Sequence, residues 1–596
     1  MEYGKASTEN NTWLILEYCA ACLRAARLGG LSDDDAVEVD MRLAAVAHLH
    51  GNASWALRLY YQIMGRPSTT DSGRLAMSIL GLTMAPPKLL RSPHMVARFR
   101  EDWTSGLRTL EHKLRAGAEL WDPHAQMGRT PFHLAHQGGP DFPLMGALAG
   151  AFDAAAPSVR FTAPHCERGA NGKTAWRLGQ RSARIGFFSL HMRDHSIGRM
   201  MALLIIHLAE DPNFEVHVFG PEDDRSGNPG EEVMAEGDPV VNAVQGGVHH
   251  WHEAPRALDE ARRAVAQQEL DVLVYPDIGM EALTYFMAFA RLAPIQCVWW
   301  GHPVTPSTGA IDYFLSLDAE TDEGQADYLE QMVRMDVINT APFRQAFRVS
   351  HTYHIFPFTQ FLPRNCRLRN DQVKLSPEQK KASEHFEGVA PFPSPATGLP
   401  SPAMKPHESS IDSSPRTGRV VNEEQIKRRD NAPSTISPSN TFSSSSRTSS
   451  TAISCLRTYL VFGRLFKLHS DFDPAIEGIL VGDSAGCVVL IHETRDEEWT
   501  RAVWSTLIGK LAPKGVGERL RIIHYWNYPE ALRTASAVLD TFPYGGCLTV
   551  LEALSNGVPV VTLPAHHIRG RFALAMYQQM GYTELVAKDV EVCHDM

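Results

Sequence analysis

The chain has 596 residues, of which 44% are hydrophobic, and it carries a formal net charge of −11. This length predicts several domains with cores of their own, and the acidic balance argues against general nucleic-acid binding, which needs a basic surface. No stretch approaches the ~18–20 apolar residues of a membrane span, and the N-terminus lacks the pattern of a secretory signal. We therefore expect a cytoplasmic or nuclear protein that binds neither nucleic acid nor membrane.

Nine cysteines are scattered without regular spacing. Cys19 and Cys22 lie in an Ala-rich stretch with no second pair at zinc spacing, so we interpret them as helix-packing thiols and not as metal ligands. The others are Cys166, Cys297, Cys366, Cys455, Cys487, Cys547 and Cys593. We expect all nine to be reduced, as is usual inside cells.

Residues 1–165 predict a helical domain, because apolar residues recur at spacings of three and four and strand-like runs are rare. The piece LAAVAHLHGNASWALRLYYQIM resembles one tetratricopeptide helix–turn–helix. A single unit does not form a repeat array. A generic helical domain and a degenerate repeat domain therefore both remain open.

Residues 180–362 predict a first α/β domain. Short apolar runs alternate with helical stretches at 197–209, 254–268 and 281–291, and this alternation is typical of βαβ units in a parallel sheet. The expected strands lie in RIGFFSL, FEVHVFG, LDVLVYPD, IQCVWW and IDYFLSL.

Residues 363–454 are rich in Ser and Pro, a composition that cannot bury enough apolar surface to fold, so they predict a disordered insertion. Residues 455–596 then predict a second α/β domain. Its strands are expected in YLVFG, AGCVVLIHE, RLRIIHYW, AVLDTFPY and VPVVTLP. In doubly wound folds of this kind, ligands bind at the carboxyl ends of the strands.

A glycine turn gives the strongest chemical pattern in the second domain. A strand that ends at Asp540 is followed by Gly545 and Gly546, and a helix begins near Cys547. Glycines let a ligand approach the backbone, and the N–H groups at a helix start favour an anion such as diphosphate. Similar turns also occur in proteins that bind nothing there.

Other residues support this interpretation. Leu548 and Thr549 lie in the first turn of the helix, Glu552 lies one turn further, where a carboxylate can accept hydroxyl groups, and Gly557 fits a helix C-cap. Lys467 opens the same domain, and a lysine there can neutralise charge that develops on a leaving phosphate.

Two segments of the first domain each follow the carboxyl end of a predicted strand. HMRDHSIGRM contains His191 and His195, which can act in acid–base chemistry or bind hydroxyls, although turn histidines are often only structural. WGHPVT places Gly301, His302, Pro303 and Thr305 after the next strand, where we expect them on the acceptor or sugar side of the same crevice. Trp299 and Trp300 lie in the strand itself, so we expect them in the core.

Taken in order, four motifs resemble the catalytic region of the protein O-linked N-acetylglucosaminyltransferase family. They are RIGFFSLHMRDHSIGRMM, LAPIQCVWWGHPVTPSTGAIDY, FGRLFKLHSDFDP and LDTFPYGGCLTVLEALSNGVPVVTLP. The exact residues of these motifs are nearer to those of the bacterial-type branch, which includes adhesin N-glucosyltransferases. The resemblance covers about 184–340 and 456–596, and four ordered motifs are more specific than one.

The resemblance implies a GT-B fold, with two Rossmann-like domains and the UDP-sugar on the second, and metal-independent inverting transfer to a protein side chain without a cofactor. His195 matches the family's active-site histidine and Lys467 its phosphate-binding lysine. The segment Cys547–Thr549 matches donor-binding positions, and Glu552 matches the ribose-contacting acid.

The sequence departs from the family at several points. Cys547 and Leu548 replace polar residues, so two donor contacts are in doubt, and Arg464 stands where animal enzymes carry glutamine. The chain stops at Met596, whereas relatives continue with further helices, so we expect an incomplete second domain. An incomplete gene model or an inactive relative would explain this.

We predict transfer of N-acetylglucosamine from its UDP conjugate to Ser or Thr of a polypeptide acceptor. UDP-glucose is the next donor, and uracil is expected near His524–Tyr528. A non-catalytic scaffold and a UDP-sugar epimerase or hydrolase remain alternatives. The sequence leaves the oligomeric state open.

Overall fold

The computed structural model describes residues 92–115, 123–124, 130–167, 181–221, 237–336, 455–492 and 497–591, with residues 40, 43, 59 and 338. The tetratricopeptide-like piece, except Leu43 and Leu59, and the Ser/Pro-rich stretch lie outside these residues. So do Cys19, Cys22, Cys366 and Cys593. The described residues all belong to one compact unit formed by Met1–Pro357 and Ala452–Met596.

The described part of the N-terminal region is helical, as predicted. Phe99 and Trp103 pack edge to face, with ring centroids 5.6 Å apart, and share a hydrophobic core with Phe152. The helices here are α5 (Pro93–Arg115) and α7 (Phe142–Ala155), with short 3-10 turns η1 (Phe132–Gln137), η2 (Pro157–Val159) and η3 (Pro164–Cys166). None of the described helices is long and apolar enough to cross a membrane.

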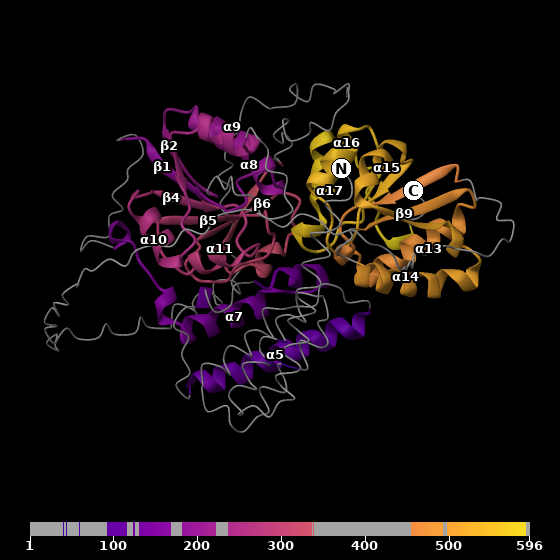
Figure 1. Cartoon of the computed structure of the whole chain (residues 1–596), viewed down its shortest axis with the longest axis horizontal. Helices are drawn as coiled ribbons and strands as arrows, with labels where there is room; N and C mark the ends of the chain where they lie inside the picture. The colour runs from indigo at the N-terminus through magenta and orange to yellow at the C-terminus, as the bar shows by residue number, and fades with distance from the viewer. Residues whose placement is uncertain are drawn as a thin grey trace, which may run out of the picture. The chain divides into compact units, whose positions relative to one another are not determined.

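The first sheet has seven parallel strands in the order β3-β2-β1-β4-β5-β6-β7. They are β1 (Ala183–Phe188), β2 (Phe214–Gly220), β3 (His250–Glu253), β4 (Val272–Tyr275), β5 (Ile295–Trp299), β6 (Tyr313–Leu317) and β7 (Gln331–Met335). The helices between them are α8 (Ser196–Ala209), α9 (Pro239–Gly247), α10 (Leu258–Ala266) and α11 (Ala282–Met287). Figure 1 shows α8 and α9 on one side of these strands and α10 and α11 on the other.

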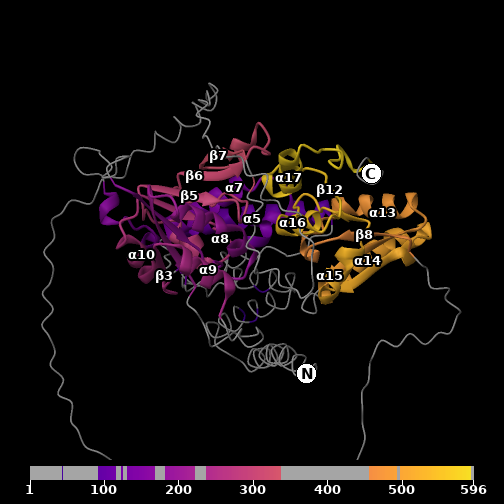
Figure 2. The same cartoon turned by 90° about the horizontal axis from the view of Figure 1, so that it is seen from above.

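The predicted parallel sheet is confirmed, but its edges were missed. The expected strands correspond to β1, β2, β4, β5 and β6, and Trp299 and Trp300 are both buried, as predicted. The edge strands β3 and β7, which Figure 2 shows far apart, are short and half exposed, so they lack an apolar signal. The helix expected from residue 254 begins only at Leu258, because β3 precedes it.

The second sheet has five parallel strands in the order β10-β9-β8-β11-β12, and all five were predicted. They are β8 (Arg457–Val461), β9 (Gly486–His492), β10 (Leu520–His524), β11 (Ala537–Leu539) and β12 (Val560–Val561). Its helices are α13 (Asp473–Gly482), α14 (Glu497–Leu511), α15 (Tyr528–Thr534), α16 (Leu548–Ser555) and α17 (Phe572–Met580). Helices α13 and α14 lie on one side of the strands and α15 and α16 on the other (Figure 1).

Each sheet has a point at which the strand order reverses. In the first sheet it falls between β1 and β4, and in the second between β8 and β11. At such a point the two following loops leave toward opposite faces, which opens a crevice at the carboxyl ends of the strands. The residues after these four strands are therefore the first place to look for a ligand site.

Candidate active site

A buried carboxylate orients His191 at the reversal point of the first sheet. Asp277, which follows β4, is fully buried, and its Oδ2 lies 2.7 Å from His191 Nδ1 and accepts a hydrogen bond from Ser189 Oγ at 2.9 Å. A carboxylate accepts only, so His191 Nδ1 carries the proton and Nε2 bears the lone pair. A histidine backed by a carboxylate in this way has the tautomer that a general base needs.

His195 has a different role in the same loop. Its Nδ1 accepts a hydrogen bond from the Ile197 N–H at 3.3 Å and thereby caps α8, which begins close to the predicted helical stretch at 197–209. Nε2 then carries the proton. Burial, and then the neighbouring His191, lowers the pKa of His195 to about 3, so the ring is neutral. The two rings lie 4.5 Å apart.

The loop after β5 is tightly packed. A Cβ on Gly301 would lie 2.3 Å from the Pro276 carbonyl oxygen, so only glycine fits beside the end of β4. Pro303 is also buried. Thr305 donates to Glu330 Oε2 at 2.7 Å, which engages its hydroxyl inside the protein.

His302 in that loop is 5% exposed and stacks on Phe132, with ring centroids 5.0 Å apart. Burial lowers its pKa to about 3. His302 is therefore a neutral, buried ring whose Nδ1 lacks a hydrogen-bond partner among the described residues.

Asp540 holds the glycine turn of the second sheet. Its Oδ1 accepts from the Gly546 N–H at 2.8 Å, its Oδ2 accepts from Thr562 Oγ1 at 2.8 Å, and burial raises its pKa to about 6. The Gly545 N–H donates to the Arg569 carbonyl at 2.8 Å. Both glycine N–H groups are thus already paired, contrary to the expectation that they are free for a ligand.

The start of α16 is the other part of the predicted anion site. The first N–H groups of an α-helix have no acceptor within it, and the N-cap residue Cys547 makes no side-chain cap. Leu548 and Thr549 lie in this first turn. Burial raises the pKa of Cys547 to about 12, so its thiol is neutral. Gly557, with φ of +72°, ends the helix as predicted.

Lys467 lies at the end of a short turn, η7 (Leu465–Lys467), that follows β8. Its Nζ lies 4.7 Å from the ring centroid of Tyr544, next to the glycine turn. Burial lowers its pKa to about 8, against the opposing effect of Asp540. The lysine and the start of α16 therefore meet at the reversal point of the second sheet.

Glu552, one turn into α16, accepts from Tyr528 Oη at 3.0 Å. Burial raises its pKa, and the nearby positive charge of Arg199 opposes this. Arg199 belongs to α8, so the first-sheet loop and α16 influence each other. Tyr525 and Trp526, in the segment expected to hold uracil, are 48% and 74% exposed.

No protein-family model and no curated protein matches the chain. Among solved structures, a mutant O-GlcNAc transferase from Thermobaculum terrenum aligns with a TM-score of 0.50 and 18% identity, over 96% of this chain and 84% of that one. A glycosyltransferase from Rickettsia africae ESF-5 has a TM-score of 0.29 and 8% identity, over 70% and 93% of the two chains. A sucrose-phosphate synthase from Thermosynechococcus elongatus has a TM-score of 0.28 and 8% identity, over 69% and 93%.

The protein has a GT-B fold. The fold class inferred from the motifs is therefore confirmed. The identity is too low for the alignment to carry donor or acceptor over.

Sequence reasoning missed two parts of this GT-B site. Asp277 stands in a predicted strand, YPD, and a carboxylate at a strand end was a usable signal. The segment 130–141 was assigned only to a helical domain. Its His136 is fully buried against Tyr544 and Phe466, with centroids 4.4 and 4.8 Å away, and burial lowers its pKa well below the usual value.

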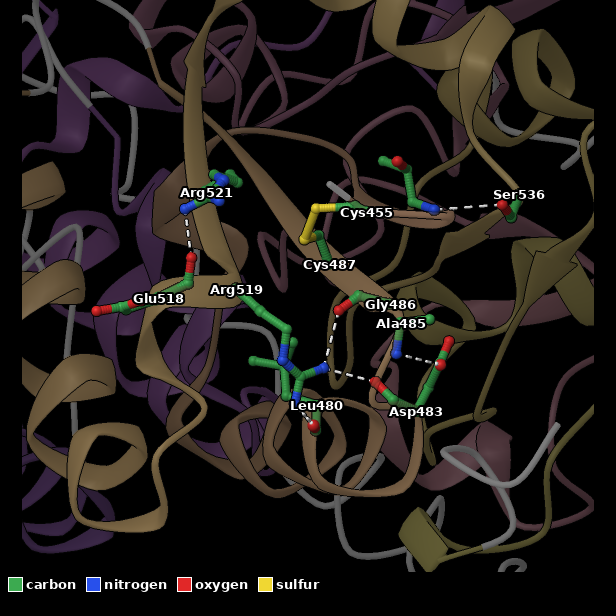
Figure 3. The surroundings of a disulfide bond; sticks show 11 residues. Cys455, Leu480, Asp483, Ala485, Gly486, Cys487, Glu518, Arg519, Arg521 and Ser536 are labelled. Atoms are coloured by element: carbon green, nitrogen blue, oxygen red, sulfur yellow. Dashed lines mark hydrogen bonds between the residues drawn. A yellow bond between two sulfur atoms is a disulfide. The ribbon is translucent and has the colours of Figure 1, made fainter. Parts of the chain in front are cut away.

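One pair of cysteines corrects the expectation that all thiols are reduced. Cys455 and Cys487 form a disulfide with a Cα–Cα distance of 5.7 Å, beside the loop in which Arg519 donates to the Asp483 and Gly486 carbonyls (Figure 3). Pairing of β8 with β9 brings the two cysteines together. Cys166, Cys297 and Cys547 are free.

Two groups among the described residues have the composition of a metal site. They are Glu215, His217 and His250, and Asp327, His566 and His567. Neither contains a residue that we assigned to donor or acceptor.

Proposed function

We propose that the protein is an inverting glycosyltransferase that moves N-acetylglucosamine from UDP-N-acetylglucosamine to Ser or Thr of proteins. The proposal rests on the residues at the two points where the strand order reverses. In the first sheet, His191 is hydrogen-bonded to the carboxylate of Asp277. In the second sheet, Lys467 lies near the start of α16, whose N-cap residue makes no side-chain cap. A proton acceptor and a diphosphate cradle are what a displacement at an anomeric carbon needs.

In this proposal the diphosphate lies at the first turn of α16, from Cys547 to Thr549. Helix N–H groups and the positive end of the helix dipole attract it, and Lys467 neutralises the charge that develops on UDP as it leaves. Glu552 accepts ribose hydroxyls. Tyr525 and Trp526 offer exposed rings to the base.

The acceptor hydroxyl attacks the anomeric carbon from the opposite side. We assign proton acceptance to His191, because its bond to Asp277 leaves the lone pair on Nε2, whereas His195 presents an N–H and orients the substrate. His302 is proposed to face the acceptor or sugar. No metal or cofactor takes part in these steps. We retain a cytoplasmic or nuclear location as part of the proposal, and the Cys455–Cys487 disulfide weighs against it, because disulfides are rare in those compartments.

Two alternatives stay in view. UDP-glucose fits the same diphosphate cradle, so transfer of glucose to protein is the second candidate. A non-catalytic scaffold is favoured by Cys547 and Leu548, which place apolar side chains where donor contacts are needed.

One assay separates these readings. The full chain is incubated with labelled UDP-N-acetylglucosamine or UDP-glucose and a serine-containing peptide library, and both UDP release and glycopeptide mass are measured. Glycopeptide from either donor identifies the sugar. Free sugar or epimer without glycopeptide indicates a hydrolase or epimerase, and UDP binding without any product indicates the scaffold. Absence of UDP binding by calorimetry would remove the transferase proposal.

A further inference from the structure

Four metal-ligand side chains lie together on β2 and β3, at one edge of the first sheet. Residues two apart on a strand share a face, so Glu215 and His217 project together from β2, and His250 and His252 project together from β3. His217 pairs with His250 in the register. We propose that Glu215, His217 and His250 bind one Zn²⁺ ion.

The distances suit a single ion. Glu215 Oε1 lies 3.1 Å from His250 Nε2 and 3.5 Å from His217 Nε2. The three ligand atoms all lie within 4.8 Å of one another. Tetrahedral zinc with bonds of about 2.0–2.2 Å places its ligand atoms about 3.3–3.6 Å apart. Small side-chain rotations therefore complete the coordination.

The hydrogen bonding of His217 points to a cation. This ring is 4% exposed, and its Nε2 has no hydrogen-bond partner among the described residues. Its Nδ1 lies 3.2 Å from His252 Nε2. If Nδ1–H donates there, Nε2 turns a lone pair toward a carboxylate oxygen, and two acceptors face each other unless a cation lies between them. The opposite tautomer does not remove the problem, because an Nε2–H at 3.5 Å from Glu215 is too far for a good hydrogen bond.

The surroundings have the features of a supported metal site. Arg184 donates to Glu215 Oε2 at 3.4 Å, which leaves Oε1 for the metal. His252 Nε2, 3.2 Å from His217 Nδ1, can accept a hydrogen bond from it, as outer-shell partners of metal-bound histidines do. The side chain of His250 is 45% exposed, so water can reach a fourth position. Imidazole and carboxylate ligands together favour zinc over calcium or magnesium.

The test is titration of the chelator-treated full chain with ZnCl₂ by calorimetry, with Co²⁺ absorption as a report on geometry. We expect H250Q to lose the site and H252Q to weaken it by about 10–100-fold. Both residues lie on an edge strand, and H250Q removes a half-exposed ring, so both variants should fold. H207Q is the matched control, because His207 is also an exposed histidine paired with a glutamate, Glu210.

Loss of one equivalent of Zn²⁺ in H250Q but not in H207Q supports the site, together with loss of the tetrahedral Co²⁺ spectrum. Cys19 and Cys22 lie outside the described residues, so binding that persists equally in H250Q and H207Q would assign the zinc elsewhere and overturn the proposal. Absence of binding to the parent chain would overturn it as well. Neither outcome depends on transferase activity.

Discussion

Replacing Lys467 by methionine tests the diphosphate cradle most directly. Methionine keeps the apolar stem against Tyr544 but removes the charge, so folding should change little. A hydrogen bond to a charged group contributes about 1.5–3 kcal/mol, which corresponds to about 10- to 150-fold in affinity. We expect UDP to bind Lys467→Met weaker by this factor at ~pH 7 in calorimetry.

The pH dependence makes the test specific. The pKa of Lys467 is about 8 in the free protein, so the lysine is charged below that pH and neutral above it. A bound diphosphate holds the proton, so UDP affinity falls as pH rises above about 8, by at most about tenfold per pH unit. Lys467→Met should lose this dependence.

Lys514 provides a matched control, because it lies in the same half of the chain, is 47% exposed and pairs with Glu477. Lys514→Met should bind UDP like the parent at every pH. If Lys467→Met binds UDP as tightly as Lys514→Met and keeps the same pH profile, the lysine does not contact the diphosphate.

Three further predictions follow from single contacts. Asp277→Asn should lower transfer by about 10²–10⁴-fold, because an amide can turn its NH₂ group toward His191 Nδ1 and so permits the wrong tautomer, which a carboxylate excludes, while UDP affinity stays unchanged; equal rates would contradict the assigned base. Gly546→Ala should destabilise the fold by about 1–3 kcal/mol in urea unfolding, because its Cβ would lie 2.2 Å from Phe462 Cε2; an unchanged midpoint would refute this packing. The disulfide between Cys455 and Cys487 predicts that thiol titration of the denatured chain finds two more thiols after reduction than before. Cys455→Ser should abolish that difference. Equal counts in the parent chain before and after reduction would mean that the disulfide is not formed.

The sequence predicted the sheets well where strands are buried on both faces. Apolar runs such as those of β4 and β9 have no polar face, so they stand out against the helices beside them. Strand β3, with the sequence HWHE, contains no such run. Its place in the sheet depends on pairing with β2, which local sequence does not encode.

The site was predicted in part for similar reasons. Lys467 and the start of α16 were found because each follows a strand. The hydrogen bond from the Gly546 N–H to Asp540 was not predicted, because this contact depends on the path of the turn. Likewise, the partnership of Asp277 with His191 arises only because β4 pairs with β1, although 86 residues separate the two side chains.

The bond between Cys455 and Cys487 has a consequence for the second sheet. Cys455 lies two residues before β8, which is the central strand of that sheet. A covalent anchor at the start of this strand fixes the register of β8 on β9. The loop after β8, which carries Lys467, therefore starts from a strand that is held by a covalent bond as well as by backbone hydrogen bonds.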